Sequence, residues 1–286
     1  MNDADASANI ARIVQSPSYR VAYRDTELMT GPDLRPVRME LELLKPELYL
    51  RKHKIRSTIV VFGSTQIIEP AAAQTRLDQA WRALAEAPND RKRQRTAAQA
   101  ERLVEWSHYY DKAREFGRLV SKACQPDGPY DYVVTTGGGP GIMEAANRGA
   151  YDAGAKSIGL NIRLPHEQQP NPYITPDLCF QFHYFAMRKL HFLLRAKALV
   201  VFPGGFGTLD ELFDALTLRQ TGRMQKLPVI LFGPDYWRRV VDFQFLADQG
   251  TVADEDLDLL NFADTAEEAW AMIRRFYAAK ETSASL

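Results

Sequence analysis

Two segments of the chain share the order of a short apolar strand, a glycine-rich turn and a helix. One is Ala198–Leu212 (ALVVFPGGFGTLDEL), and the other is Tyr132–Asn147 (YVVTTGGGPGIMEAAN). Glycine lets the backbone approach a ligand closely, and the first N–H groups of a helix have no intrahelical acceptor. Each turn therefore predicts an anion site. Because parallel strands end at one edge of a sheet, the two turns together predict a single crevice there.

Strands and helices alternate along most of the chain. Apolar runs predict further strands at 57–62, 156–162, 178–183 and 227–232. Helical segments are predicted at 70–87, 91–123, 185–196, 209–221, 236–246 and 265–279, and a surface loop is predicted at 165–176. The segment 178–183 alternates apolar and polar residues, which indicates a strand near the sheet edge. This order predicts an α/β fold, a Rossmann-like doubly wound sheet that is mainly parallel and has helices on both faces.

The N-terminal part of the chain lacks strand character. Met39–Arg51 has the spacing of an apolar helix face, interrupted by Pro46. It predicts a helical arm that packs on the core or on a partner subunit, while residues 1–20 have the composition of either such an arm or a loose tail. We therefore expect an N-terminal helical extension over residues 1–55 and a Rossmann-like nucleotide-binding catalytic domain over residues 56–286.

Composition excludes several classes of function. The 286 residues include 36 Lys and Arg and 36 Asp and Glu, so no net positive field favours nucleic acid. The basic run at 91–95 is typical of a solvated helix face, with a nucleic-acid patch as the weaker alternative. Cys124 and Cys179 form no scaffold or metal pattern and indicate thiols in a reducing compartment. Neither a signal peptide nor a membrane span is visible, so a cytoplasmic protein without a metal is expected.

The motifs GGGPGIMEAAN at 137–147 and PGGFGTLDE at 203–211, with Met187-Arg188-Lys189 between them, resemble the LOG family. These proteins are cytokinin riboside 5′-monophosphate phosphoribohydrolases and related nucleotide 5′-monophosphate nucleosidases. The resemblance covers residues 57–280. The family has carried the label lysine decarboxylase, but the sequence shows no pyridoxal-phosphate site.

The resemblance implies an enzyme that hydrolyses the N-glycosidic bond of a nucleoside 5′-monophosphate such as AMP or a cytokinin riboside 5′-monophosphate. The products would be the free base and ribose 5-phosphate, and no cofactor is implied. It also implies a homodimer or a higher homo-oligomer, for which the apolar faces of the helices at 185–196 and 209–221 are candidate interfaces. Neither nucleic acid nor membrane is an expected partner.

The resemblance also assigns the residues of the site. Glu211 would be the catalytic carboxylate and Arg188 its catalytic partner. The residues implied to bind the substrate or its phosphate are Gly138, Gly139, Gly204, Gly205, Gly207, Thr208, Glu144, Lys189 and Ser64. A carboxylate near C1′ would stabilise oxocarbenium character or activate water. A guanidinium has a pKa above about 12 and cannot act as an acid at neutral pH, so Arg188 is better interpreted as a clamp.

Structural roles compete with these assignments. Thr208 is placed to cap a helix, and Glu211 in its first turn would complement the helix dipole. Glu144 would cap its helix or bond a ribose hydroxyl, and it shares with Asp210 the open role of protonating the base. Phe206 would pack on the turn or face the base. Arg188 and Lys189 would be surface residues in this interpretation.

Two alternative functions follow from the same residues. A non-catalytic nucleotide sensor would keep the glycine turns but would not need both Arg188 and Glu211. A Rossmann dehydrogenase is disfavoured, because the first strand is not followed by Gly-x-Gly-x-x-Gly. The first strand is followed instead by Gly63-Ser64-Thr65-Gln66, without the basic residue that relatives often have soon after the serine.

Overall fold

The computed structural model of the protein describes residues 3–125, 128–165 and 169–284, with side chains as far as residue 279. Residues 166–168, near the start of the predicted loop at 165–176, lie outside these residues. The chain separates into two units, Met1–Lys45 and Pro46–Leu286. The domain boundary expected after residue 55 stays a prediction.

The smaller unit is helical, with α1 (Asp3–Gln15), α2 (Thr26–Thr30) and the start of α3 (Arg35–Lys52). Asp25 begins α2 by accepting hydrogen bonds from the backbone N–H groups of Glu27 and Leu28, each at 3.1 Å. The prediction that Pro46 interrupts the third helix is wrong, since α3 continues through it. Proline removes one backbone hydrogen bond, and the burial of Pro46 and Leu50 offsets that loss.

The larger unit is built on a seven-stranded sheet in which neighbouring strands of the described residues pair in parallel, in the order β4-β3-β2-β1-β5-β6-β7. The strands are β1 (Thr58–Phe62), β2 (Val133–Thr136), β3 (Ser157–Ile162), β4 (Cys179–Phe182), β5 (Ala196–Val201), β6 (Val229–Phe232) and β7 (Leu260–Ala263). The predicted α/β class and the position of 178–183 at the sheet edge are confirmed. Strand β7 was missed because it is short and follows an acidic segment, Asp254–Asp258, that carries no strand signal.

The helices of this unit are α4 (Pro70–Glu86), α5 (Arg91–Trp106), α6 (His108–Cys124), α7 (Ile142–Asp152), α8 (Phe185–Leu194), α9 (Phe206–Gln220), α10 (Pro234–Val240), α11 (Phe243–Asp248) and α12 (Ala266–Ala284). The single helix expected at 91–123 is two helices that meet at Ser107. The hydroxyl of Ser107 donates to the carbonyl of Val104 at 2.7 Å and helps to end α5. Over the described residues, no helix is both long and apolar enough to cross a membrane.

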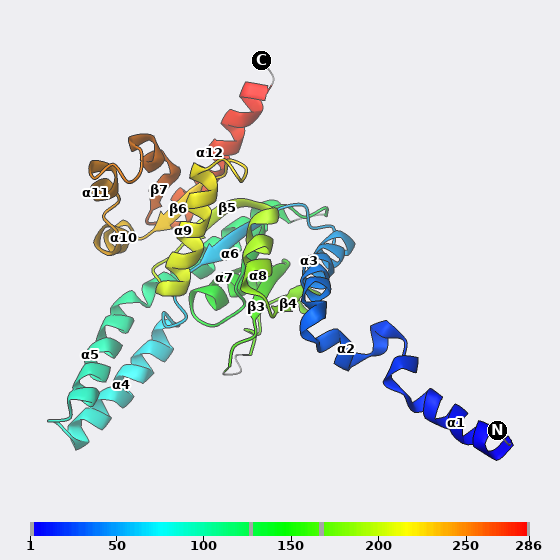
Figure 1. Cartoon of the computed structure of the whole chain (residues 1–286). Helices are drawn as coiled ribbons and strands as arrows, with labels where there is room; N and C mark the ends of the chain where they lie inside the picture. The colour runs from blue at the N-terminus through cyan, green and yellow to red at the C-terminus, as the bar shows by residue number, and fades with distance from the viewer. Residues whose placement is uncertain (1–2, 126–127, 166–168, 285–286) are drawn as a thin grey trace. The chain divides into compact units, whose positions relative to one another are not determined.

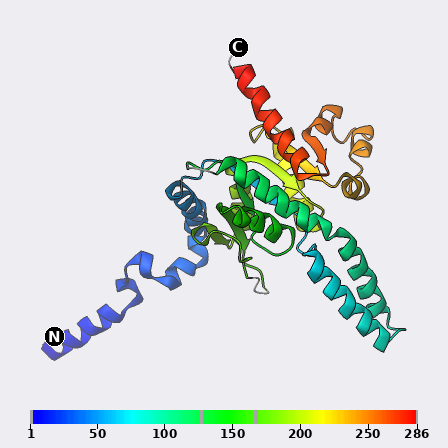
Figure 2. The ribbon, with the colours of Figure 1, turned by 180° about the vertical axis from the view of Figure 1, so that it is seen from behind.

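Each face of the sheet has its own apolar core. Ile59 and Val61 of β1 lie in a cluster with buried residues of α6, α7 and α12, whereas Val60 and Phe62 lie in another with α8 and α9. The view of Figure 1 shows α8 and α9 in front of the sheet, and Figure 2 shows α6 and α7 from behind. Alternate side chains of the central strand are therefore buried on both faces, as a doubly wound parallel sheet requires.

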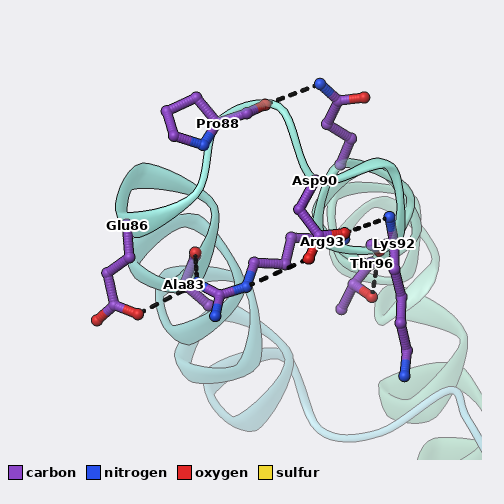
Figure 3. Close-up of polar contacts among 8 residues, drawn as sticks. Ala83, Glu86, Pro88, Asp90, Lys92, Arg93 and Thr96 are labelled. Atoms are coloured by element: carbon purple, nitrogen blue, oxygen red, sulfur yellow. Dashed lines mark hydrogen bonds and ion pairs between the residues drawn. The ribbon is translucent and has the colours of Figure 1, made fainter.

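Helices α4 and α5 run side by side as a hairpin with a small apolar core of their own (Figures 1 and 2). At its tip, Arg93 donates to the carbonyl of Ala83 and pairs with Glu86 at 3.2 Å, and Asp90 caps α5 (Figure 3). Arg93 of the basic run at 91–95 thus helps to close the hairpin, and the other four residues of the run are exposed. This agrees with the interpretation of a solvated helix face.

Candidate active site

The site lies where the direction of the sheet order reverses. From β1 the chain builds β2, β3 and β4 on one side, and β5 then pairs with the other side of β1. The loops after β1 and β5 consequently diverge, which is where open α/β sheets form ligand crevices. A cavity of about 450 Å³ is present there, lined by the loops after β1, β2 and β5 and by α8.

Most of the residues predicted for the site meet in this cavity. Its lining includes Ser64, Gly139, Arg188, Gly205, Gly207, Thr208 and Glu211. Gly139 and Gly205 come from the two glycine-rich turns, so the prediction that both turns share one sheet edge is confirmed. The loops are also tied together, because the N–H of Ser64 donates to the carbonyl of Pro203 at 2.9 Å.

Gly138 and Gly204 lie behind the cavity wall and shape it. Gly138 has φ +73°, and a Cβ there would lie 2.0 Å from Oδ1 of Asn161. A Cβ on Gly204 would lie 2.2 Å from the hydroxyl of Thr208, and the Gly204 carbonyl accepts from Tyr236 at 2.5 Å. Both positions therefore require glycine because their neighbours are too close for a side chain.

Glu144 and Lys189 are not brought into the cavity lining. Glu144 accepts a hydrogen bond from the hydroxyl of Tyr110 at 2.8 Å, and the structure shows no side-chain cap on α7. Lys189 pairs with Asp210 at 2.8 Å and lines a different cavity. Asp210 is likewise absent from the cavity lining among the described residues. Neither proton-donor candidate is thus placed beside the cavity.

Two further expectations about the turn after β5 are corrected. Helix α9 begins at Phe206 with Gly205 at its N-cap, so Thr208 lies inside the first turn and does not cap the helix. Glu211 accordingly falls in the second turn. Phe206 neither packs on the turn nor is shielded by it, because 92% of its surface is exposed at the cavity rim.

Arg188 and Glu211 form a buried ion pair across the cavity wall. The Nη2 of Arg188 on α8 lies 3.2 Å from Oε1 of Glu211 on α9, and their side chains are 16% and 7% exposed. The guanidinium lies over the rings of Phe185 and Phe192, at 5.3 and 5.5 Å from their centroids. The Nε of Arg188 is buried and has no hydrogen-bond partner among the described residues. The ion pair therefore leaves one N–H donor of Arg188 unused within the described part of the chain.

The electrostatics of the pair favour a proton-exchanging carboxyl group. Burial raises the pKa of Glu211 to about 7, against the opposing charges of Arg188 and Lys189. Burial also lowers the pKa of Arg188, and Glu211 counteracts this effect. A carboxyl group that titrates near neutrality and lies at the wall of a cavity has the protonation behaviour of a general base or acid.

This raised pKa predicts a pH-dependent stability. The folded protein binds the Glu211 proton more tightly than the unfolded chain, so the stabilisation is present below the unfolded pKa and is lost as pH rises through about 7. The free energy of unfolding of wild type, minus that of Glu211→Gln, should fall by about 3 kcal/mol between pH 4 and 8. Urea denaturation of both proteins across this range measures it. Parallel pH profiles would contradict the raised pKa.

Sequence reasoning missed the asparagines that support the loop after β2. The Asn171 side chain donates to the carbonyl of Gly139 at 3.1 Å and to Oδ1 of Asn147 at 3.0 Å. Asn147 also accepts from Thr136 at 2.6 Å, and Asn161 lies in the cavity lining. The available signal was an asparagine at the carboxyl end of an otherwise apolar strand, SIGLNI.

The loop after β1 is contacted by a positively charged side chain from α4. Gln66 lies in the cavity lining, and its side-chain oxygen accepts from Nη1 of Arg76 on α4 at 3.2 Å. The basic residue that is missing after Ser64 thus has a counterpart about two helical turns into α4. Nothing in the local sequence of the loop could have indicated this contact.

The family model described as "Possible lysine decarboxylase" matches residues 143–273. A pyridoxal-type decarboxylase needs a lysine for a Schiff base with its cofactor. Among the described residues that line the cavity there is no lysine, and Lys189 points its amine to Asp210. These residues do not fit that cofactor.

Relatives of known name match most of the larger unit. The cytokinin riboside 5′-monophosphate phosphoribohydrolase LOG3 of Arabidopsis thaliana is 29% identical over 168 residues, which is 57% of this chain and 73% of that protein. The pyrimidine/purine nucleotide 5′-monophosphate nucleosidase of Escherichia coli K12 is 32% identical over 129 residues, 38% of this chain but 27% of that enzyme. A solved molybdenum cofactor binding protein of Rippkaea orientalis is 22% identical and covers 59% of this chain and 88% of its own, with a TM-score of 0.44. The two glycine-rich motifs, the Arg-Lys pair between them and the sequence matches show that the chain is similar to the LOG family.

Proposed function

We propose that the protein hydrolyses the N-glycosidic bond of a nucleoside 5′-monophosphate and releases the base and ribose 5-phosphate. The observation that carries this proposal is the buried Arg188–Glu211 pair in a cavity between two glycine-rich turns. The names of the plant and bacterial relatives support the same reaction class. The proposal concerns the larger unit, which holds all of these residues.

The phosphate is best accommodated at the start of α9. The backbone N–H groups of its first turn, Phe206 to Thr208, have no intrahelical acceptor and carry the positive end of the helix dipole. Ser64 adds a hydroxyl from the neighbouring loop, and both residues 64 and 208 lie in the cavity lining. A phosphate seated here extends its ribose toward Arg188, whose unpartnered Nε can donate to a phosphate or ribose oxygen.

Glu211 then acts on the anomeric carbon. Breaking the C1′–N bond places positive charge on the ribose, which the carboxylate stabilises electrostatically. The oxygen of a water molecule bonds to C1′, its proton passes to Glu211, and the electron pair of the C1′–N bond leaves with the base. A carboxyl group with a pKa of about 7 can then return that proton to the base. We therefore assign protonation of the base to Glu211 in place of Asp210 and Glu144, since the described cavity lining contains neither of these two residues.

The base faces an apolar wall. Met143, Ile162, Leu164, Phe185 and Phe192 line the same cavity as the ion pair. Flat apolar contacts suit a planar base, and AMP or a cytokinin riboside 5′-monophosphate is the substrate we propose. The second candidate, a nucleotide sensor without catalysis, would use the glycine turns alone and leaves the raised pKa of Glu211 without a purpose.

We also propose that the protein works as a cytoplasmic homo-oligomer. Phe185, Leu190 and Leu194 of α8 are 51%, 39% and 49% exposed, which is unusual for residues of this size on one short helix. They support the helix as a subunit interface.

The phosphate should be essential for turnover. We expect kcat/KM for AMP to exceed that for adenosine by about 100-fold or more, because contacts to the remote phosphate position C1′ against Glu211. Chromatography of the released bases from AMP, GMP, CMP, a cytokinin riboside 5′-monophosphate and adenosine measures both this ratio and the base preference. Equal rates for AMP and adenosine would contradict phosphate binding at α9. Tight nucleotide binding without release of any base would instead favour the sensor.

A further inference from the structure

Helix α3 carries a row of apolar side chains on an exposed face. Val37, Leu41, Leu44 and Leu48 are 40%, 50%, 42% and 56% exposed, and they follow one another at intervals of four, three and four residues. We call these four residues the α3 seam. The same helix buries Pro46 and Leu50, so the seam is a second apolar surface of α3. A row of half-exposed apolar side chains of this kind is expected to be covered by a partner.

The spacing of the seam is that of the a and d positions of a coiled coil. With Leu41 and Leu48 at a, and Val37 and Leu44 at d, the flanking positions can be read directly. The g positions within the helix are Glu40 and Glu47, and the e positions are Arg38, Lys45 and Lys52. Every g position is thus acidic and every e position is basic.

We propose that the α3 seam binds the α3 seam of a second copy of this chain, with the two helices parallel and in register. In a parallel pair each g residue faces the e residue of the next heptad in the partner, so that Glu40 faces Lys45 in both directions. An antiparallel pair would instead bring g to g and e to e, with like charges opposed. The charge pattern is therefore complementary to itself in only one orientation.

The Glu40–Lys45 contact carries this selectivity. Glu47 is already paired with Arg195 at 2.5 Å, and Arg38 donates to the carbonyls of Met29 and Gly31. The surface lies on α3 and shares no residue with the cavity of the candidate active site. The inference is consequently independent of the proposed function.

Charge reversal on the full-length protein tests the orientation. Glu40→Lys alone and Lys45→Glu alone should each weaken self-association by roughly 3- to 30-fold, because two attractive contacts become repulsive. The double variant Glu40→Lys/Lys45→Glu should restore it, and an equimolar mixture of the two single variants should form mixed assemblies in preference to either alone. Arg35→Glu is the matched control, since position 35 flanks the seam from outside the e and g rows and should leave association unchanged. Sedimentation velocity over a concentration series measures all five proteins.

Substitutions within the α3 seam test whether this surface forms the contact between the two copies. Leu41→Asp/Leu44→Asp should reduce the mass of the assembly by at least half, while circular dichroism of the folded domain is retained. In a background with Cys124→Ser and Cys179→Ser, Leu41→Cys and Leu44→Cys should each form a self-linked disulfide dimer under mild oxidation, because equivalent a and d residues face each other in a parallel pair. Arg35→Cys should not. Unchanged association in the aspartate variant, or tighter association of Glu40→Lys, would overturn the proposal.

Discussion

Replacing Glu211 by glutamine should reduce kcat for the release of adenine from AMP by about 100-fold or more, with KM changed by less than about threefold. The substitution keeps the shape of a side chain that is 7% exposed and removes its charge. The loss falls on kcat because the carboxylate interacts most strongly with the positive charge that develops in the transition state. Nucleotide binding should be retained, since the phosphate contacts that we propose come from the glycine turns and the start of α9.

The pH dependence of kcat/KM tests whether Glu211 is the group whose ionisation controls turnover. In wild type, kcat/KM should rise with a midpoint near pH 7, because the carboxylate is the active form and burial raises the pKa of Glu211 to about 7. This ascending limb should be absent from Glu211→Gln. Glu267→Gln is the control, because it makes the same chemical change on α12 of the same unit and Glu267 is absent from the described cavity lining. Full turnover in Glu211→Gln, with nucleotide bound, would exclude the catalytic role and leave the sensor as the better account.

Replacing Arg188 by alanine should lower kcat/KM by about 100-fold or more, through both binding and turnover. Among the described residues the Nε–H of Arg188 has no hydrogen-bond partner, while its Nη2 donates to Glu211, so we expect the guanidinium to bridge the substrate and the carboxylate. The positive charge of Arg188 also lowers the pKa of Glu211, against the larger effect of burial, which raises it. Removing that charge should raise the pKa of Glu211 further, and the ascending limb of kcat/KM should move to higher pH.

The conservative variant Arg188→Lys separates charge from geometry. Lysine keeps the positive charge but lacks the planar fork, so the pH limb should stay close to that of wild type while kcat/KM remains reduced. Steady-state kinetics from pH 5 to 9, with calorimetric titration of AMP, measure both effects. A pH profile of Arg188→Ala identical to that of wild type would show that the pair is not electrostatically coupled.

The sequence by itself determined the features that depend on local backbone chemistry. Apolar runs that end in glycine predicted two of the strands whose loops form the cavity, and the meeting of both turns at one edge followed from the parallel sheet. The motif resemblance also selected Glu211 and Arg188. It could do so because the glycines and the residues that follow them are contiguous in the chain.

Only the tertiary structure decided how distant residues meet. The pairing of β1 with β5 sets the reversal of strand order, and it joins segments more than a hundred residues apart. Glu144 was a plausible site residue until Tyr110 of α6 was seen to bind it, and Arg76 reaches Gln66 from another helix. Glu211 is likewise only 7% exposed and paired with Arg188 of another helix, and the burial that raises its pKa depends on this tertiary setting, which no local pattern encodes. Contacts of this kind are set by the closure of the whole sheet, so the sequence alone named the catalytic candidates but could not supply their protonation or their partners.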